Sequence, residues 1–418
     1  MQGPSNMQAP FVTTHRPSYA VSPFVLATAT AVLLATRLSA QPAAQPARPA
    51  SCVPAGFAPP TIVYRATEQL SDGRVAFKLC APEASTVSVT SSDADPAIPT
   101  GFGGGPSGLT LTKDSLGLWS GTTAVPVKPG TYRYNFRVNG ARVPDPRATR
   151  FSEERTGINS ILEVTGAEGE FQAFDPKVPH GAVSTIEYSS ASLGVTRRAH
   201  VYTPPGYMRG SASFPVLYLV HGAGDSDDSW TSEGHAQYIL DNLIAAGKAK
   251  PMIVVMPFGH TPDRPGADML TNTDFGDDLH KDLIPFVEAN FRMQTDRASR
   301  AMAGLSMGGA HTLQFGLTRS DRFAYVGVFS MGLIDSTQVK AYEAKNAAAL
   351  QRGAAGPQAF RLVYYAIGKD DFLYRTVAPT RGLLDKYHVN YVYHESGGGH
   401  TWMNWRDYLA DFAPRLFR

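Results

Sequence analysis

Short, unbroken apolar runs recur in the second half of the chain, and they constrain its fold more than any other feature. The runs occupy residues 216–220, 252–256, 325–329, 362–367 and 391–393. They do not alternate with polar residues, as strands with one wet face do, so they are typical of strands buried on both faces. Helical stretches lie between them, such as 277–290, where apolar residues recur at intervals of three and four. This pattern predicts an α/β fold with a mainly parallel central sheet.

A different pattern precedes these runs. Between residues 59 and 165, short β-rich runs alternate with turn signals, at 61–64, 74–79, 86–89, 109–111, 118–121 and 132–138. Strands at this spacing predict a small all-β sandwich. In the last run, one face by period two consists of Tyr132, Tyr134, Phe136 and Val138. The other consists of Arg133, Asn135 and Arg137. We expect the aromatic face to be core.

Length and composition bound the class of protein. The chain has 418 residues, which suffices for two domains, and its 43% hydrophobic and 18% charged residues are ordinary for a globular protein. The formal net charge is only +2, and no Lys/Arg run is present, so we expect no nucleic-acid partner.

The first residues have the pattern of a targeting segment. Arg16 precedes an apolar stretch at 24–35, and small residues follow at Ser39 and Ala40. We predict a signal peptide over 1–40 and a Pro/Ala/Gln-rich spacer over 41–58. The apolar stretch is short for a membrane span, so the mature protein is expected to be secreted or periplasmic without a membrane anchor.

The domain boundary and the cysteines complete the organisation. Glycines and prolines mark a linker over 166–180, which leaves 59–165 as the sandwich and 181–418 as the second domain. That domain opens with a predicted hairpin around Leu193-Gly194. Cys52 and Cys80 could form a disulfide in an exported protein, with two free thiols as the alternative. Neither lies near a cluster of metal-ligand residues, so no metal site is expected.

The run from Gly304 to Gly308 has the form Gly-x-Ser-x-Gly, with Ser306 at its centre. A serine nucleophile needs a sharp turn between strand and helix, and glycines let the two backbones approach each other. The apolar residues before it and the helical spacing after it fit such an elbow. Ser306 is therefore the candidate nucleophile.

Other strand ends carry the groups that a serine nucleophile requires. The loop that follows residue 220 holds Ala223 and Gly224, whose N–H groups could join that of Met307 in an oxyanion hole; an ordinary turn is the alternative. His400 lies in a loop after the last strand and is the candidate general base, better placed than His388 or His394.

An acid that orients this base is expected after the strand at 362–367. Asp370 and Asp371 both follow it, and the alternative is that both only cap the next helix. With either aspartate, the order Ser, Asp, His is that of an α/β-hydrolase.

Several motifs carry a family resemblance. They are Tyr202 to Tyr207, Tyr218 to Gly222, Met252 to Pro257 and Ala303 to Gly309. With them, the region 180–418 resembles the bacterial putative-esterase family of α/β-hydrolases, which includes feruloyl, acetyl xylan and enterochelin esterases and the mycolyltransferases. The resemblance implies Asp371 as the triad acid, because relatives carry Gly-x-x-Asp after this strand. Residues 116–146 resemble an immunoglobulin-like early-set domain, in which Trp119 is expected to be core rather than a sugar platform.

The resemblance implies an exported serine carboxylesterase that hydrolyses feruloyl or acetyl esters of plant glycans through an acyl-serine intermediate. Alternatives are an acyltransferase of the mycolyltransferase type, a siderophore esterase of the enterochelin type and a non-catalytic glycan-binding protein. The expected partner is a small or glycan-linked ester, and acyl-serine chemistry needs no cofactor or metal. Four apolar residues in or near strand-end loops are possible substrate contacts, although each is more often core: Trp230, Phe258, Leu333 and Trp402.

Overall fold

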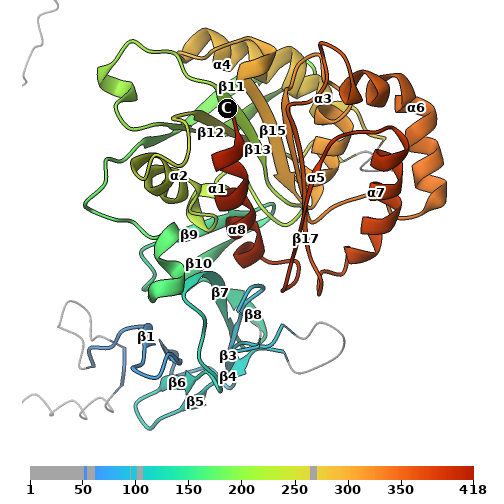
Figure 1. Ribbon diagram of the computed structural model, residues 1–418. Coiled ribbons are helices and arrows are strands. Elements are labelled where there is room, and N and C mark those ends of the chain that lie inside the picture. Colours follow the sequence, from blue (N-terminus) through green and yellow to red (C-terminus); the bar gives the residue numbers. More distant parts are fainter. Residues whose placement is uncertain (1–50, 54–61, 95, 101–106, 264–270) are drawn as a thin grey trace, which may run out of the picture. The chain divides into compact units, whose positions relative to one another are not determined.

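The computed structural model describes residues 51–53, 62–94, 96–100, 107–263 and 271–418. The predicted signal peptide and most of the spacer lie outside these residues. Three sheets make up the described part, and Figure 1 shows their strands and helices in sequence colours. None of the helices in this part is both long enough and apolar enough to cross a membrane.

The first two sheets come from residues 67–164, and every pairing between their strands is antiparallel. One has the order β1-β2-β6-β5 and the other the order β4-β3-β7-β10-β9, with β8 paired to β7. The strand bounds are β1 Thr67–Gln69, β2 Val75–Cys80, β3 Val87–Thr90, β4 Leu109–Thr110, β5 Thr112–Lys113, β6 Leu118–Thr122, β7 Gly130–Val138, β8 Ala141–Val143, β9 Phe151–Glu154 and β10 Gly157–Val164. The predicted all-β region is confirmed, whereas its immunoglobulin-like character stays a prediction.

Strand β7 is buried on both faces as far as Phe136. Its aromatic residues Tyr132, Tyr134 and Phe136 lie in the core between the sheets, as their spacing predicted. Arg133 and Asn135 on the opposite face are also buried, at 7% and 3% exposure, whereas Arg137 on that face is exposed. Arg133 is covered because it contacts carboxylates of the later domain, which alternation within one strand could not reveal.

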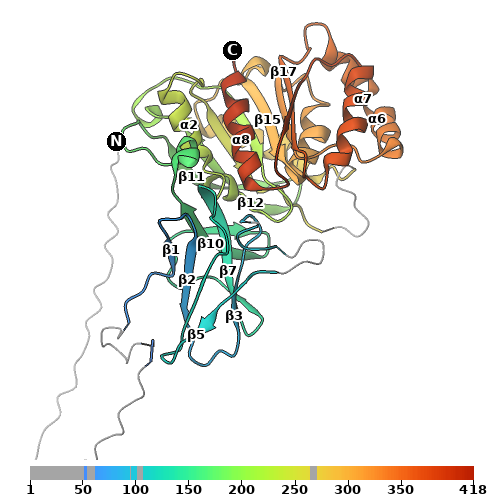
Figure 2. The ribbon, with the colours of Figure 1, turned by 60° about the horizontal axis from the view of Figure 1, so that its bottom comes forward.

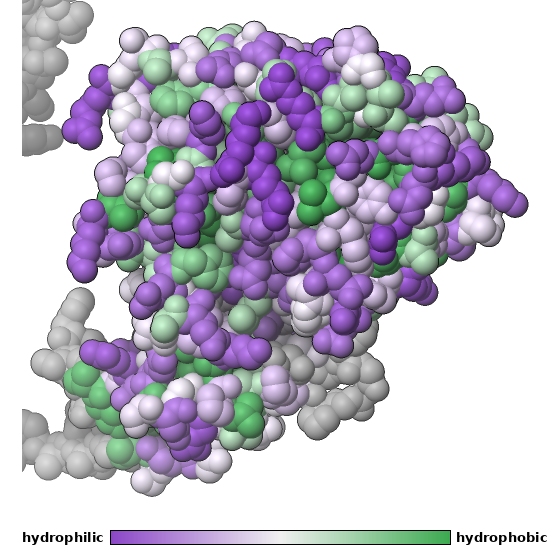
Figure 3. Space-filling view, in the orientation of Figure 1, coloured by the Kyte–Doolittle hydropathy of each residue, from purple (hydrophilic) through white to green (hydrophobic). Residues whose placement is uncertain are grey.

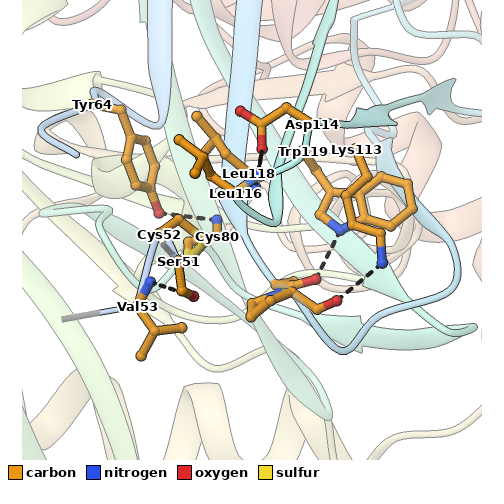
Figure 4. Close-up of a disulfide and its surroundings, with 12 residues drawn as sticks. Ser51, Cys52, Val53, Tyr64, Cys80, Lys113, Asp114, Leu116, Leu118 and Trp119 are labelled. Atoms are coloured by element: carbon orange, nitrogen blue, oxygen red, sulfur yellow. Dashed lines mark hydrogen bonds between the residues drawn. A yellow bond between two sulfur atoms is a disulfide. The ribbon is translucent and has the colours of Figure 1, made fainter. Parts of the chain in front are cut away.

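A disulfide joins Cys52 to Cys80, the last residue of β2, with Cα atoms 5.7 Å apart (Figure 4). The backbone N–H of Cys80 donates to the hydroxyl of Tyr64 at 3.1 Å. The strand predicted at 61–64 does not form in its described residues, and Tyr64 serves this contact instead. Trp119 is buried as expected, and its indole N–H donates to the Ala81 carbonyl at 2.8 Å.

The predicted linker over 166–180 is packed rather than free. It contains a short 3-10 helix, Ala167–Gln172. Asn242 donates to the carbonyls of Phe171 and Ala173 at 3.1 and 3.0 Å, and the His180 ring lies 2.9 Å from an Asp241 oxygen. Together with the contacts of Arg133, these hydrogen bonds tie the two parts of residues 50–418 together.

The third sheet has eight strands in the order β11-β12-β14-β13-β15-β16-β17-β18. β11 and β12 form the predicted hairpin, β12 pairs antiparallel with β14, and all later pairings are parallel. The bounds are β11 Ala182–Ser190, β12 Val195–Thr203, β13 Val216–Val220, β14 Ile253–Pro257, β15 Arg300–Leu305, β16 Tyr325–Phe329, β17 Leu362–Gly368 and β18 Val392–Ser396. The mainly parallel sheet predicted from the apolar runs is confirmed.

Two hydrophobic clusters cover the two faces of this sheet, which explains why its strands are apolar without alternation. Tyr218 and Val220 belong to one cluster, whereas Leu217 and Leu219 belong to the other. Helices α2 and α8 pack into the second cluster, and α4, α6 and α7 into the first (Figures 1 and 2). The helix bounds are α1 Ser229–Ser232, α2 Ala236–Ala245, α3 Asp274–Asp277, α4 Ile284–Asn290, α5 Met307–His311, α6 Ser336–Ala354, α7 Val377–Lys386 and α8 Trp402–Phe412.

The helix predicted over 277–290 is present, but it includes a π-helical segment, Asp278–Leu283, between α3 and α4. On the outside, hydrophilic and hydrophobic residues are interspersed over the face seen in Figure 3. Scattered apolar residues of this kind are normal for a protein surface.

Candidate active site

Ser306 lies between β15 and α5, at the carboxyl end of a central strand. Its φ is 50° and its ψ is −114°, and its N–H donates to the Phe329 carbonyl at 2.9 Å. A non-glycine residue held in such a region costs about 1–3 kcal/mol and persists only where the surrounding structure imposes it. Strand, sharp turn and helix follow each other as the Gly-x-Ser-x-Gly motif predicts.

The glycines around Ser306 are required by close backbone approach. A Cβ atom on Gly304 would lie 2.4 Å from the carbonyl carbon of Gly308. A Cβ atom on Gly308 would lie 2.3 Å from the carbonyl oxygen of Val220. Backbone atoms cannot move aside as a flexible side chain can, so any larger residue would force β13, β15 and α5 apart.

The loop that follows β13 lies against the serine. A Cβ atom on Gly222 would lie 3.5 Å from the Cβ of Ser306. The Gly222 N–H donates to Oδ2 of Asp225 at 3.0 Å, which closes the loop into a tight turn. The buried Asp225 carboxylate therefore fixes the backbone beside the candidate nucleophile.

The expected oxyanion donors lie on this loop and at the start of α5. Ala223 and Gly224 form the exposed tip of the turn, whereas Met307 is buried as the first residue of the helix. Within the described chain, the N–H groups of these three residues donate no hydrogen bond to another protein atom. They are thus available to a ligand, as donors for a developing oxyanion must be.

His400 and Asp371 are in direct contact. Nδ1 of His400 lies 3.0 Å from both carboxylate oxygens of Asp371, and this carboxylate is fully buried. Asp371 also accepts from the N–H of Leu373 at 2.8 Å. Asp370, in contrast, is exposed, and its N–H donates to the Gly398 carbonyl. The geometry therefore pairs the histidine with Asp371.

The loop that presents His400 is held by Asn404 of α8. Its amide donates to the Gly397 carbonyl at 2.7 Å and to the Ser396 hydroxyl at 3.0 Å. Gly398 has a φ of +75°, and a Cβ atom there would lie 2.6 Å from the Asn404 amide oxygen. This glycine-rich loop is consequently a fixed turn rather than a loose connection.

Contacts through α8 relate the histidine to the serine. Trp405 packs edge-on against the His400 ring at 5.0 Å and donates to the Ser330 hydroxyl at 3.0 Å. Ser330 follows Phe329, whose carbonyl accepts from Ser306. Among the described residues, no hydrogen bond joins Ser306 to the His400 ring. Such bonds are often long before substrate binds and tighten in the complex.

Three of the four expected substrate contacts are buried in the core. Trp230, Leu333 and Trp402 are 1%, 1% and 0% exposed, so they are core residues and present no ring or side chain to a ligand. For these three the expectation is corrected. Trp230 in α1 and Trp402 at the start of α8 pack into one hydrophobic cluster of the sheet, and Leu333 packs into the other. Phe258 is half-buried and packs 5.9 Å from the His221 ring.

Buried histidines lie in and near the loop that carries the candidate oxyanion donors. Burial lowers the pKa of His221, lowers that of His260 to about 4 and lowers that of His311 to about 3. All three are therefore neutral at neutral pH and place no positive charge near Ser306. Across the described ranges, no three potential metal-ligand side chains gather as a metal site requires.

The comparisons with known proteins agree with this geometry. The family model described as "Putative esterase" matches residues 190–416. The chain belongs to the putative-esterase family.

Relatives of this family member include the endo-1,4-beta-xylanase/feruloyl esterase of Xylanibacter ruminicola, 32% identical over 83% of this chain and 45% of the relative. The chain thus spans less than half of that relative's length. A feruloyl esterase module from Clostridium thermocellum in complex with sinapinate has a TM-score of 0.52 at 23% identity, covering 62% of this chain and 94% of the module. The enterochelin esterase of Shigella flexneri has a TM-score of 0.60 at 16% identity, covering 84% of this chain and 95% of the esterase. These structures establish the α/β-hydrolase fold.

The sequence of this putative-esterase family member did not reveal the role of Arg133. Arg133 of β7 donates to Oδ1 of Asp225 at 2.6 Å and lies 2.5 Å from a Glu233 oxygen and 3.2 Å from an Asp93 oxygen. Burial opposes its charge, but the three carboxylates outweigh burial and raise the pKa of Arg133. The arginine therefore stays charged and holds the aspartate that shapes the loop beside Ser306.

The backbone of the N-terminal sheets reaches the same loop. Glu154 at the end of β9 forms an antiparallel bridge with Asp225, and the N–H of Arg155 bonds to the Gly224 carbonyl. For the contact between the N-terminal sheets and this loop, the sequence signal was a charged residue, Arg133, among the aromatic residues of β7. The partner of Arg133 could not be assigned without the fold.

Proposed function

We propose that this chain is an exported serine carboxylesterase that hydrolyses acyl esters of plant glycans, with feruloyl or acetyl groups as the acyl part. One observation carries the proposal. The His400 ring is held by both oxygens of the buried Asp371, at the sheet edge where Ser306 sits in a strained turn. This arrangement supplies the base, its orienting acid and the nucleophile of acyl transfer.

In the first half of the reaction, Asp371 holds the proton on Nδ1 of His400, which leaves Nε2 free to accept one. His400 takes the Ser306 proton as Oγ attacks the ester carbonyl. The N–H groups of Met307 and of Ala223 or Gly224 stabilise the tetrahedral oxyanion. The C–O bond to the alcohol then breaks, His400 gives its proton to the leaving oxygen, and an acyl-serine remains.

In the second half, water replaces the alcohol. His400 removes a proton from the water as its oxygen attacks the acyl-serine carbonyl. The second tetrahedral intermediate collapses, Ser306 recovers its proton from His400, and the carboxylic acid leaves. The residues of the chain carry every proton transfer in both halves.

The acyl group and the alcohol of the proposed substrate are inferred from relatives of this chain. The Xylanibacter ruminicola relative combines a xylanase with a feruloyl esterase, and this chain matches it over most of its own length. The signal-like pattern of residues 1–40 supports export. We therefore assign an ester on a plant cell-wall glycan as the substrate class.

Substitution of Ser306 by Ala tests the proposal. We expect hydrolysis of 4-nitrophenyl acetate and methyl ferulate to fall by about 10⁴-fold or more, with an unchanged circular dichroism spectrum. Ser320→Ala is the matched control, because Ser320 is a fully buried serine outside the site. Retained turnover in Ser306→Ala would remove this residue from the mechanism.

The same assays separate the other candidate functions. Partition of product between water and added sugar distinguishes hydrolysis from transfer to carbohydrate. A siderophore ester included in the substrate panel tests the enterochelin-type alternative. Binding of a xylan oligosaccharide without turnover of any ester would instead indicate a glycan-binding protein.

A further inference from the structure

A cleft of about 1490 Å³, lined by both polar and apolar residues, opens beside His400. One wall comes from the N-terminal sheets and includes Asn135, Arg137 and Arg142. The other wall comes from the loop that carries His400 and from α8, including Asp407. Small-molecule sites usually occupy roughly 300–1,000 Å³, so this cleft has room for more than a single acyl group.

The cleft cannot open or close freely, because its walls are joined beneath it. Arg133 of β7 pairs with Asp225 and Glu233. Arg406 of α8, fully buried, donates to the carbonyls of Thr131 and Glu233 at 3.1 and 3.0 Å. A preformed cleft loses little conformational entropy when it binds a ligand.

Its charges are balanced among the described lining residues. Arg142 is paired with Glu154 at 2.7 Å, and Asp93 with Arg133 at 3.2 Å. The remaining lining charges comprise two cations, Lys128 and Arg137, and two anions, Asp370 and Asp407. Such a lining does not favour an ionic ligand of either sign. The lining offers donors, such as Lys128 and Arg137, together with acceptors, such as Asp370 and Asp407. Both kinds of group suit a neutral, hydroxyl-rich ligand, since every sugar hydroxyl both donates and accepts.

Phe372 lies where the cleft meets the catalytic histidine. Its side chain is 55% exposed, and its ring centroid lies 4.5 Å from that of His400. The exposed part of this ring gives the cleft an apolar surface at its His400 end, against which a ring of the ligand can pack.

We propose that this cleft is a saccharide subsite, formed jointly by the N-terminal sheets and the hydrolase domain, that binds the sugar chain, which is the alcohol part of the ester. This inference rests on the proposed esterase function. The subsite gives the N-terminal sheets a direct part in choosing the substrate. In one wall Arg137 would donate to sugar hydroxyls, and in the other Asp407 would accept from them.

The test compares two esters of one acid. For each protein, kcat/KM is measured with a feruloylated xylan oligosaccharide and with methyl ferulate, and the ratio of the two values is taken. We expect Arg137→Ala and Asp407→Ala each to lower this ratio about tenfold, since each removes a charge-assisted hydrogen bond. Arg74→Ala is the matched control, because Arg74 is exposed on the N-terminal sheets and does not line the cleft.

An unchanged ratio in both variants would overturn the subsite while leaving the esterase proposal intact. If the wild-type protein hydrolyses neither ester, the esterase proposal fails, and titration calorimetry of Ser306→Ala with the unesterified xylan oligosaccharide decides the subsite separately. Binding that Arg137→Ala weakens about tenfold supports the subsite, whereas no binding overturns it.

Discussion

Two histidine–aspartate pairs in this protein have nearly the same geometry and different surroundings. Nδ1 of His400 lies 3.0 Å from Asp371, and Nδ1 of His200 lies 2.8 Å from Asp227. The two ring side chains are similarly exposed, at 16% and 14%, and both carboxylates are fully buried. Neither the distance nor the burial separates a catalytic pair from a structural one.

The other nitrogen of each ring separates them. Nε2 of His200 lies 3.1 Å from the Thr185 hydroxyl, and Asp227 is also bound by Arg198, so every polar group of this pair is engaged. In His400, no hydrogen bond to Nε2 is present among the described residues, and aromatic rings of Phe372 and Trp405 flank the imidazole. A general base needs a nitrogen that can accept a proton, so of these two pairs the His400 pair fits the proposed catalytic role.

The largest expected difference is in turnover. His400→Ala should lower kcat for methyl ferulate by roughly 10⁴- to 10⁶-fold, because the base is lost. His200→Ala should keep kcat within about threefold of wild type, since that ring lies outside the proposed mechanism. Steady-state kinetics of both purified variants decides the matter, and comparable losses in the two would show that the roles of the pairs are misassigned.

Asp371, the acid of the proposed catalytic pair, should have the next largest effect on turnover when it is substituted. Asp371→Asn retains the shape of the side chain but loses the charge that fixes the His400 tautomer, so kcat should fall about 10⁴-fold with a small change in KM. Asp370→Asn is the neighbouring control and should stay within about twofold. A larger loss in Asp370→Asn would transfer the role to that residue.

The pair formed by His200 and Asp227 should instead affect the free energy of unfolding. Burial alone would raise the pKa of Asp227, but hydrogen bonds from His200 and Arg198 outweigh it and lower this pKa. The stabilisation is therefore present above the pKa of an unfolded aspartate, about 3.9, and is lost as the pH falls towards the lower folded-state value.

Asp227→Asn should accordingly lower the free energy of unfolding by about 1–3 kcal/mol at pH 7, and the difference from wild type should shrink below about pH 4. Urea unfolding at several pH values measures both. A difference that stays constant with pH would mean that the charge of Asp227 does not stabilise the fold.

The smallest effect on stability is expected for Thr185, whose hydroxyl contacts Nε2 of His200. Thr185→Val removes the exposed partner of Nε2 and should cost less than about 1 kcal/mol of unfolding free energy, without a change in kcat. Urea unfolding and steady-state kinetics measure the two quantities. A free Nε2 alone should not create a second catalytic centre, and new esterase activity in Thr185→Val combined with Ser306→Ala would contradict that.

Features with a local sequence signal could be predicted. Unbroken apolar runs indicated the parallel strands, because burial on both faces leaves no polar position. The elbow at Ser306 was predictable for a similar reason, since a Cβ atom at Gly304 or Gly308 would lie only 2.3–2.4 Å from backbone atoms, which permits glycine alone. His400 could be proposed from its place after the last strand, although its contact with Asp371 required the fold.

Features that depend on distant partners could not be predicted. Arg133 alternates with aromatic residues in β7, and alternation predicts that it faces water; it is buried against carboxylates of the hydrolase domain instead. Trp230 and Trp402 follow strand ends, where ligands often bind, yet they pack against each other with ring centroids 5.1 Å apart. In each case a tertiary contact decided between interpretations that the local pattern left open.

The bridge between Glu154 and Asp225 has a consequence for protein engineering. A fragment that begins at residue 181 would retain the serine, histidine and aspartate but would leave the turn beside the serine without its neighbouring strand and without the guanidinium that neutralises its carboxylate. Truncation at residue 181 should therefore yield a slower catalyst, and exchange of the N-terminal sheets between homologues should alter the rate of turnover as well as the choice of substrate.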